Sequence, residues 1–214
     1  MALIRGRFIA FEGGEGAGKS TQARLLAQAL VDRDLDVVVT REPGGTPGGE
    51  AIRRLLLDAG EEGWGVRAEA LLFAAARADH VASLIAPTLA GGRWVVCDRF
   101  IDSSRAYQGG GGGLSDADIS ELHRVGSEGL LPDRTILIDV SSENAAARVA
   151  KRDMGRIDSI GGRDAAYHAR VAARFKQIAT SEPDRYAIID GNGSAEETHA
   201  AVIDALSPLL ENGP

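Results

Sequence analysis

The residues whose types and spacing indicate chemistry most clearly are residues 13–20, which read Gly-Gly-Glu-Gly-Ala-Gly-Lys-Ser. They fit G-x-x-x-x-G-K-[ST], the spacing of a loop that binds phosphate groups. Glycines let backbone N–H groups approach anionic oxygens, and the N-terminus of a following helix adds a partial positive charge. Lys19 can then reach β- and γ-phosphates, and the Ser20 hydroxyl can bind Mg²⁺. The nucleotide contacts we expect are Gly13, Gly14, Glu15, Gly16, Ala17, Gly18, Lys19, Ser20 and Thr21.

A second candidate group is the pair Asp98-Arg99, which follows the apolar stretch 94–97. An acid at the end of a strand in a phosphate-loop protein is placed to serve the magnesium shell. The adjacent arginine can bind a phosphate with two parallel hydrogen bonds. A structural ion pair is the alternative interpretation.

Two further candidates, Phe73 and Arg77, lie four residues apart in a predicted helix over residues 66–86 and so share one face. On spacing alone, a core phenylalanine beside a surface arginine is the simpler interpretation.

Basic residues are concentrated in one part of the chain, where eight of the 24 lysines and arginines lie between positions 148 and 176. A solvated helix face explains most of them. For Arg152 and Arg156 the alternative is a segment that covers a bound anion.

The elements that must position these residues alternate along the chain. The phosphate loop follows an apolar strand over residues 8–11 and precedes a helix over residues 21–33. Continuous apolar strands that alternate with helices predict an α/β fold with a parallel sheet covered on both faces. The five glycines at 109–113 are expected to form a loop, with a flexible linker as the simplest interpretation. The other predicted strands cover residues 37–40, 94–97, 135–140 and 186–190.

The size and charge of the chain narrow its class. Its 214 residues suit one domain, which we expect to span residues 1–214. The net charge of −7 argues against a nucleic-acid-binding surface. The single cysteine, Cys97, fits a reducing compartment. We find no signal peptide and no apolar run of about 18 residues, so we expect a cytoplasmic protein without a membrane partner.

Several stretches together resemble the bacterial thymidylate kinase family. They are the phosphate loop, Thr-Arg-Glu-Pro-Gly-Gly-Thr at 40–46, Asp98-Arg99, and Ala-Tyr-Gln-Gly-Gly-Gly at 106–111. Many nucleotide enzymes share the loop, whereas the stretches at 40–46 and 106–111 are far more specific. The resemblance implies a P-loop NTPase fold with five parallel strands, and transfer of the γ-phosphoryl group of ATP to dTMP. It also implies Mg²⁺ as cofactor and a homodimer.

The resemblance also implies roles for individual residues. Phe73 would stack on thymine and Arg77 would hydrogen-bond its edge. Arg53 and Arg99 would bind the dTMP phosphate, and Glu15 the sugar 3′-hydroxyl. Asp98 would serve the magnesium shell. The base and sugar pocket would be completed by Ser104, Tyr107 and Gln108.

A short lid over about residues 148–164 is the last implied feature. The phosphate loop holds no arginine, so the chain resembles the branch of the family in which the lid supplies one, and Arg152 matches that position. The family often has Asp-Arg-x-Glu in its lid, where this chain reads Asp-Ser-Ile-Gly at 158–161. Arg156 and Arg163 lie near enough to compensate. Gly112 replaces a residue that is often basic.

Two other functions remain open on the sequence. One is a kinase for another nucleoside monophosphate or for a deoxynucleoside. The other is a nucleotide-binding switch without turnover, which only the altered lid favours.

Overall fold

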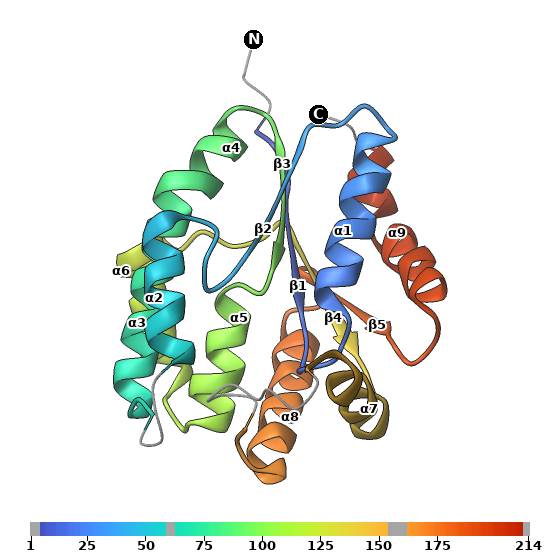
Figure 1. The fold of residues 1–214 in the computed structure, drawn as a ribbon. Coiled ribbons are helices and arrows are strands. Elements are labelled where there is room, and N and C mark those ends of the chain that lie inside the picture. Colours follow the sequence, from blue (N-terminus) through green and yellow to red (C-terminus); the bar gives the residue numbers. More distant parts are fainter. Residues whose placement is uncertain (1–4, 59–62, 154–161, 212–214) are drawn as a thin grey trace.

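The computed structural model describes residues 5–58, 63–153 and 162–211, without the side chains of Arg152 and Asp153. Five strands form one sheet in the order β2-β3-β1-β4-β5, and every neighbouring pair is parallel. The predicted five-stranded parallel sheet is therefore confirmed (Figure 1). The strands are β1 (Phe8–Glu12), β2 (Val37–Arg41), β3 (Trp94–Asp98), β4 (Arg134–Asp139) and β5 (Tyr186–Asp190).

Helices cover both faces of the sheet, as Figure 1 shows. Ile9 and Phe11 of β1 pack with α1 and α9 on one face. Phe8 and Ala10 point to the opposite face, because side chains alternate along a strand. The helices are α1 (Lys19–Val31), α2 (Pro47–Leu57), α3 (Val66–His80), α4 (Ala86–Ala90), α5 (Ile101–Ser104), α6 (Asp116–Ser127), α7 (Ser142–Asp153), α8 (Ala165–Ser181) and α9 (Ala195–Glu211).

A π-helical turn, Val81–Ile85, joins α3 to α4, so one continuous helix runs over Val66–Ala90. Its mean hydropathy of 1.2 over its most apolar window would let it cross a membrane by length and composition alone. However, its Glu69, Arg77 and His80 are buried and hydrogen-bonded to other parts of the protein. One face of the helix thus packs against the rest of the α/β fold.

The prediction of a loop over the glycine run is wrong for its first part. A π-helical turn, Arg105–Gly111, continues α5 through three of the five glycines. A Cβ on Gly111 would lie 2.6 Å from Cζ of Tyr167, and a Cβ on Gly110 would overlap the side chain of Arg174. Both neighbours belong to α8. The glycines therefore allow two helices to pack closely, and they do not form a flexible linker.

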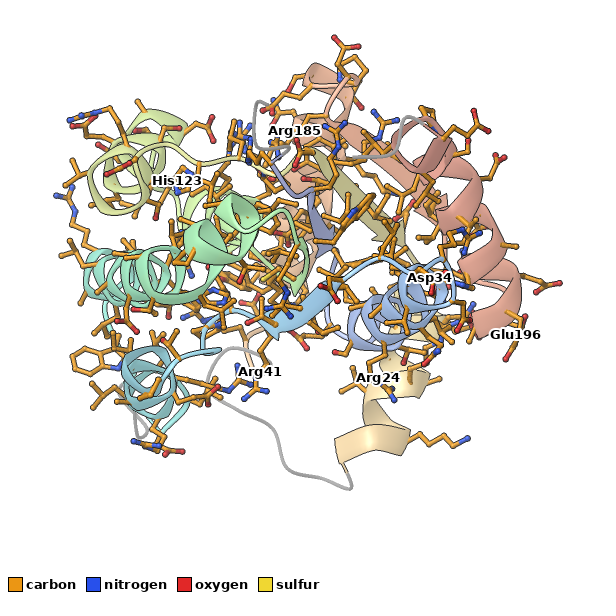
Figure 2. All side chains as sticks on the ribbon, turned by 90° about the horizontal axis from the view of Figure 1, so that it is seen from above. Arg24, Asp34, Arg41, His123, Arg185 and Glu196 are labelled. Atoms are coloured by element: carbon orange, nitrogen blue, oxygen red, sulfur yellow. The ribbon has the colours of Figure 1, made fainter. Side chains whose placement is uncertain are left out.

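His123 on α6 is buried (Figure 2) and ties the helix to the core. Its ring packs edge-on against Phe100 at 5.6 Å between centroids, and its Nε2 lies 2.6 Å from the carbonyl oxygen of Leu130. Burial, and secondarily the charge of Arg77, lower the pKa of His123 from 6.5 to about 4. The folded protein therefore keeps this ring neutral.

Acid should destabilise the protein through His123. The unfolded chain takes up this proton near pH 6.5 and the folded chain only near pH 4, so stability present above pH 6.5 is lost as the pH falls toward 4. We expect His123→Gln to remove about 2–3 kcal/mol of the fall in unfolding free energy between pH 7 and pH 4.5. Urea unfolding of both proteins at the two pH values measures this, and equal losses would contradict it.

Candidate active site

The phosphate loop connects β1 to α1 at the carboxyl edge of the sheet, at the lower end of Figure 1. Its glycines are required by close neighbours as well as by their backbone angles. A Cβ on Gly13 would lie 2.6 Å from the carbonyl oxygen of Ile138 in β4. A Cβ on Gly16 would overlap the carbonyl oxygen of Ala145 in α7. Gly18 has φ 95° at the start of α1. Elements distant in sequence therefore enclose the loop.

Lys19 lies inside this loop and is only 6% exposed. Its Nζ donates to the carbonyl oxygens of Gly13 at 3.1 Å and Gly14 at 2.7 Å. Burial and the nearby Arg99 lower the pKa of Lys19 to about 8, and the carboxylates of Glu15 and Asp98 oppose them. The ammonium therefore stays mostly charged at neutral pH, within the loop that would receive phosphates.

Ser20 and Asp98 come together because β1 and β3 are neighbours, with Phe11 opposite Asp98. The Ser20 hydroxyl donates to Oδ2 of Asp98. The other carboxylate oxygen, Oδ1, is buried and has no hydrogen-bond partner among the described residues. The part of the chain that the structure describes has no group of three or more acidic, histidine or cysteine ligands. This sparse set suits Mg²⁺, which binds through one or two protein groups with substrate phosphates and water.

A cavity of about 370 Å³ opens beside this pair. Arg24 from α1 and Arg41 from β2 line it and lie on the same side of the molecule in Figure 2. Arg24 and Arg41 bring positive charge to this end of the sheet, and Glu50 neutralises part of it through its ion pair with Arg41.

Arg99 joins the phosphate loop to the helix that follows β3. Its guanidinium donates to Glu15, to the hydroxyl of Tyr107 at 3.2 Å and to the carbonyl oxygen of Gly13 at 3.3 Å. It also lies over the Tyr107 ring, 5.0 Å from the centroid. Its φ of 70° is in the left-handed region, which is unfavourable for a residue with a Cβ. Such a backbone angle persists only where surrounding contacts enforce it, as functional sites often do.

Glu12, the last residue of β1, binds the start of the helix that follows β3. The sequence patterns did not single it out as a functional residue. Its carboxylate is fully buried and accepts from the backbone N–H groups of Phe100 and Ser103 and from the Ser103 hydroxyl. Burial, and secondarily the charge of Asp102, raise the pKa of Glu12 to about 7. The acid before the phosphate loop therefore caps the helix that carries Tyr107.

A row of residues on α3 faces a second row, which lies on α5 and on the π-helical turn that continues it. Glu69, Phe73 and Arg77 recur every four residues on α3. Glu69 accepts from Gln108 Nε2 at 2.7 Å, and Arg77 donates to Ser104 Oγ at 3.0 Å. Phe73 lies midway along its row, between these two contacts.

The exposures of Phe73 and Arg77 are the reverse of those expected from their spacing alone. Arg77 is 2% exposed, whereas Phe73 is only half-buried. Arg77 can be buried because Glu42, distant in sequence, supplies its counter-charge. A half-buried aromatic ring between two polar contacts is available to stack against a flat ligand. Glu69 was missed, although its position four residues before Phe73 was a usable signal.

Arg53 lies on α2, half-buried, and donates to the carbonyl oxygen of Pro43 at 2.9 Å. In the described part of the chain no hydrogen bond joins Arg53 to Arg99, as expected of two cations, and their shared role in binding the dTMP phosphate stays a prediction.

The predicted lid is only partly within the described residues. Arg156 and the stretch at 158–161 lie outside them, and Arg152 belongs to α7 without a described side chain. Arg163 donates to Glu69 and, at 2.5 Å, to the Tyr167 hydroxyl. Arg163 is therefore engaged in a structural contact.

Arg148 of α7 is a candidate that the motifs did not identify. It donates to the carbonyl oxygens of Gly191 at 2.8 Å and Gly193 at 3.3 Å. Its Nη1 lies 4.0 Å from where a Cβ on Gly18 would be, so it reaches the phosphate loop.

Comparisons with known proteins agree with this geometry. A sequence model described as thymidylate kinase matches residues 11–202. A thymidylate kinase of Rhizorhabdus wittichii is 58% identical over 205 residues, which are 96% of this chain and 99% of that protein. A thymidylate kinase of Nitrobacter hamburgensis is 46% identical over 96% of this chain and 90% of its own length.

Comparison with solved structures gives the same result. The crystal structure of a thymidylate kinase from Ehrlichia chaffeensis superposes with a TM-score of 0.77 at 34% identity, covering 94% of this chain and 99% of that one. The chain therefore belongs to the thymidylate kinase family, enzymes that transfer the γ-phosphoryl group of ATP to dTMP.

Proposed function

We propose that the donor and acceptor sites of this kinase meet at the contact between Glu15 and Arg99. Glu15 belongs to the phosphate loop and Arg99 begins the segment with Ser104, Tyr107 and Gln108. One ion pair thus links the loop that would bind ATP with the pocket that would bind dTMP. This contact carries the proposal, because phosphoryl transfer requires two mutually repelling anions to be positioned in line.

On the donor side, the loop glycines with Ala17, Lys19 and Thr21 would bind the ATP phosphates. Ser20 and Asp98 would hold Mg²⁺, and the buried Oδ1 of Asp98, which has no hydrogen-bond partner in the described ranges, supports this. When bound, the ion neutralises charge on the transferring phosphates. Loss of turnover on chelation of divalent metal, with recovery on adding Mg²⁺, tests the assignment.

On the acceptor side, Arg53 and Arg99 would bind the dTMP phosphate and Glu15 the 3′-hydroxyl. Ser104, Tyr107 and Gln108 would form the wall of the pocket, with the base between Phe73 and Arg77. The two matched rows of residues on α3 and α5 support this placement.

The protein contributes little covalent chemistry to this reaction. A phosphate oxygen of dTMP attacks the γ-phosphorus of ATP while the bond to the β-bridging oxygen breaks. Lys19 and an arginine of the lid at 148–164 would stabilise negative charge on the transferring oxygens. Closure of that lid would exclude water, which otherwise competes as acceptor.

Replacement of Phe73 by alanine tests the acceptor site. We expect the KM for dTMP to rise by about 10- to 100-fold, because stacking a base on an aromatic ring contributes about 1–3 kcal/mol. The KM for ATP should stay nearly constant. Phe73→Tyr keeps the ring and should retain most of the affinity. If both KM values rise together in Phe73→Ala, α3 serves structure and the base binds elsewhere.

We also propose a homodimer, which exposed apolar residues on three neighbouring helices support. Leu55 of α2, Leu71 of α3 and Val125 of α6 are 53%, 57% and 69% exposed. These helices lie side by side at one edge of the molecule (Figure 1). Sedimentation should show a dimer that Leu71→Glu dissociates and the control Leu131→Glu does not. A monomeric wild type would refute the proposal.

The remaining assignments are also proposals. A single domain over residues 1–214 predicts one cooperative unfolding transition. Cytoplasmic location predicts recovery of activity in the cytosolic fraction. The buried, unpaired Cys97 supports a reducing compartment. The absence of nucleic-acid and membrane partners stays a prediction.

A further inference from the structure

The loop that follows β2 binds the last turn of α3. Glu42 in this loop accepts from Nε of Arg77 at 2.7 Å and lies 3.0 Å from Nδ1 of His80. The side chains of Glu42 and Arg77 are 4% and 3% exposed. A buried charge pair of this kind costs desolvation and is stable only with good geometry and further hydrogen bonds.

His80 supplies part of that support from a fully buried position. Its Nε2 lies 2.7 Å from the hydroxyl of Thr40, the next-to-last residue of β2. With a proton on Nδ1, His80 donates to Glu42 and accepts from Thr40 through Nε2. The carboxylate is thus connected to the sheet through one imidazole.

The rest of the loop is built around the same helix turn. Gly45 has φ 81°, and a Cβ there would lie 2.6 Å from Nε2 of His80. Thr46 caps α2 by accepting from Gly49 and donates to Asp79. Residues 40–46 therefore pack around residues 77–80 and hydrogen-bond to them, a contact that we call the clasp.

This clasp determines which donors Arg77 can offer. Its Nε is used by Glu42, and its Nη2 donates to the carbonyl oxygen of Phe100 at 3.3 Å and to Ser104 at 3.0 Å. Across the described ranges, no residue accepts from the two N–H groups of its Nη1. A guanidinium offers donors only, so these groups suit a carbonyl oxygen and oppose an amino group.

We propose that Glu42, held by His80 and Thr40, is a positioning residue that aims Nη1 of Arg77 at the base and thereby favours a 4-oxo pyrimidine over a 4-amino one. The inference rests on the proposed role of Arg77 as the residue that contacts the base edge. It assigns Glu42 and His80 no contact with substrate.

A double-mutant cycle with Glu42→Gln and Arg77→Gln tests this in the full-length protein. Titration calorimetry gives the dissociation constants of dTMP and dCMP, and steady-state assays give the KM for ATP. We expect each single variant to lower the preference for dTMP over dCMP by about tenfold and leave the KM for ATP unchanged. The double variant should lose no more preference than Arg77→Gln alone.

Three further variants keep the test decisive if Glu42→Gln does not fold by circular dichroism. His80→Leu removes the donor to Glu42 and should lower the preference, whereas His80→Asn keeps an N–H near Nδ1 and should recover part of it. Glu50→Gln is the matched control, because Glu50 of α2 pairs with Arg41 at the end of β2, beside the same loop, and forms no ion pair with Arg77 in the described part of the chain.

The outcomes distinguish the proposed role of Arg77 at the base from the positioning role of Glu42. An unchanged preference in Arg77→Gln would refute the proposed role of Arg77. A loss in Arg77→Gln with a wild-type preference in folded His80→Leu and Glu42→Gln would overturn the positioning role. Additive losses in the double variant would also overturn it, because Glu42 would then act independently of Arg77.

Discussion

Lys19→Ala should lower kcat by about a hundredfold while the protein remains folded. The ammonium lies inside the phosphate loop, and one preorganised donor to a developing charge contributes about 3 kcal/mol. It donates to two loop carbonyl oxygens, which phosphate oxygens of ATP would replace as acceptors. Single-turnover transfer from ATP to dTMP, with the melting temperature as a check on folding, measures the effect.

A matched control is Arg33→Ala, which removes one positive charge just past the far end of α1, where Arg33 donates to the carbonyl oxygen of Ala29. It should keep the wild-type rate. A folded Lys19→Ala protein that transfers phosphate at nearly the normal rate would refute the phosphate-loop assignment.

Arg152→Ala should lower kcat by about 10³ and change the KM values for ATP and dTMP much less. A distal arginine can contribute this much to phosphoryl transfer, and a selective loss of kcat marks an interaction made in the transition state. The phosphate loop has no arginine. Arg163 is engaged by Glu69 and Tyr167, and Arg148 by two backbone carbonyl groups. Arg152 is therefore the first candidate.

Arg156→Ala should cost less, and the double variant shows whether one arginine substitutes for the other. Lys151→Ala is the control, because Lys151 is the exposed neighbour of Arg152 on α7. Assays are run at saturating ATP and dTMP. If neither the single variants nor the double variant loses tenfold in kcat, the lid-arginine hypothesis is wrong, and an arginine from a partner subunit becomes the next candidate.

The sequence by itself determined the parts of this protein that depend on local signals. Runs of apolar residues identified all five strands, and glycine spacing with Lys19 and Ser20 identified the phosphate loop before the structure placed them at one edge of the sheet. These features can be predicted because an apolar run and a glycine spacing are both patterns of consecutive residues.

Only the tertiary structure decided the features that depend on pairing across the chain. The burial of Arg77 requires Glu42, 35 positions away, and the helical course of the glycine run requires α8 against it. Spacing on one helix gave the opposite exposure for Phe73 and Arg77, because it cannot contain a counter-charge from another element. A buried charge is stable only beside its partner, and here the packing of the loop after β2 against α3 brings the partner near.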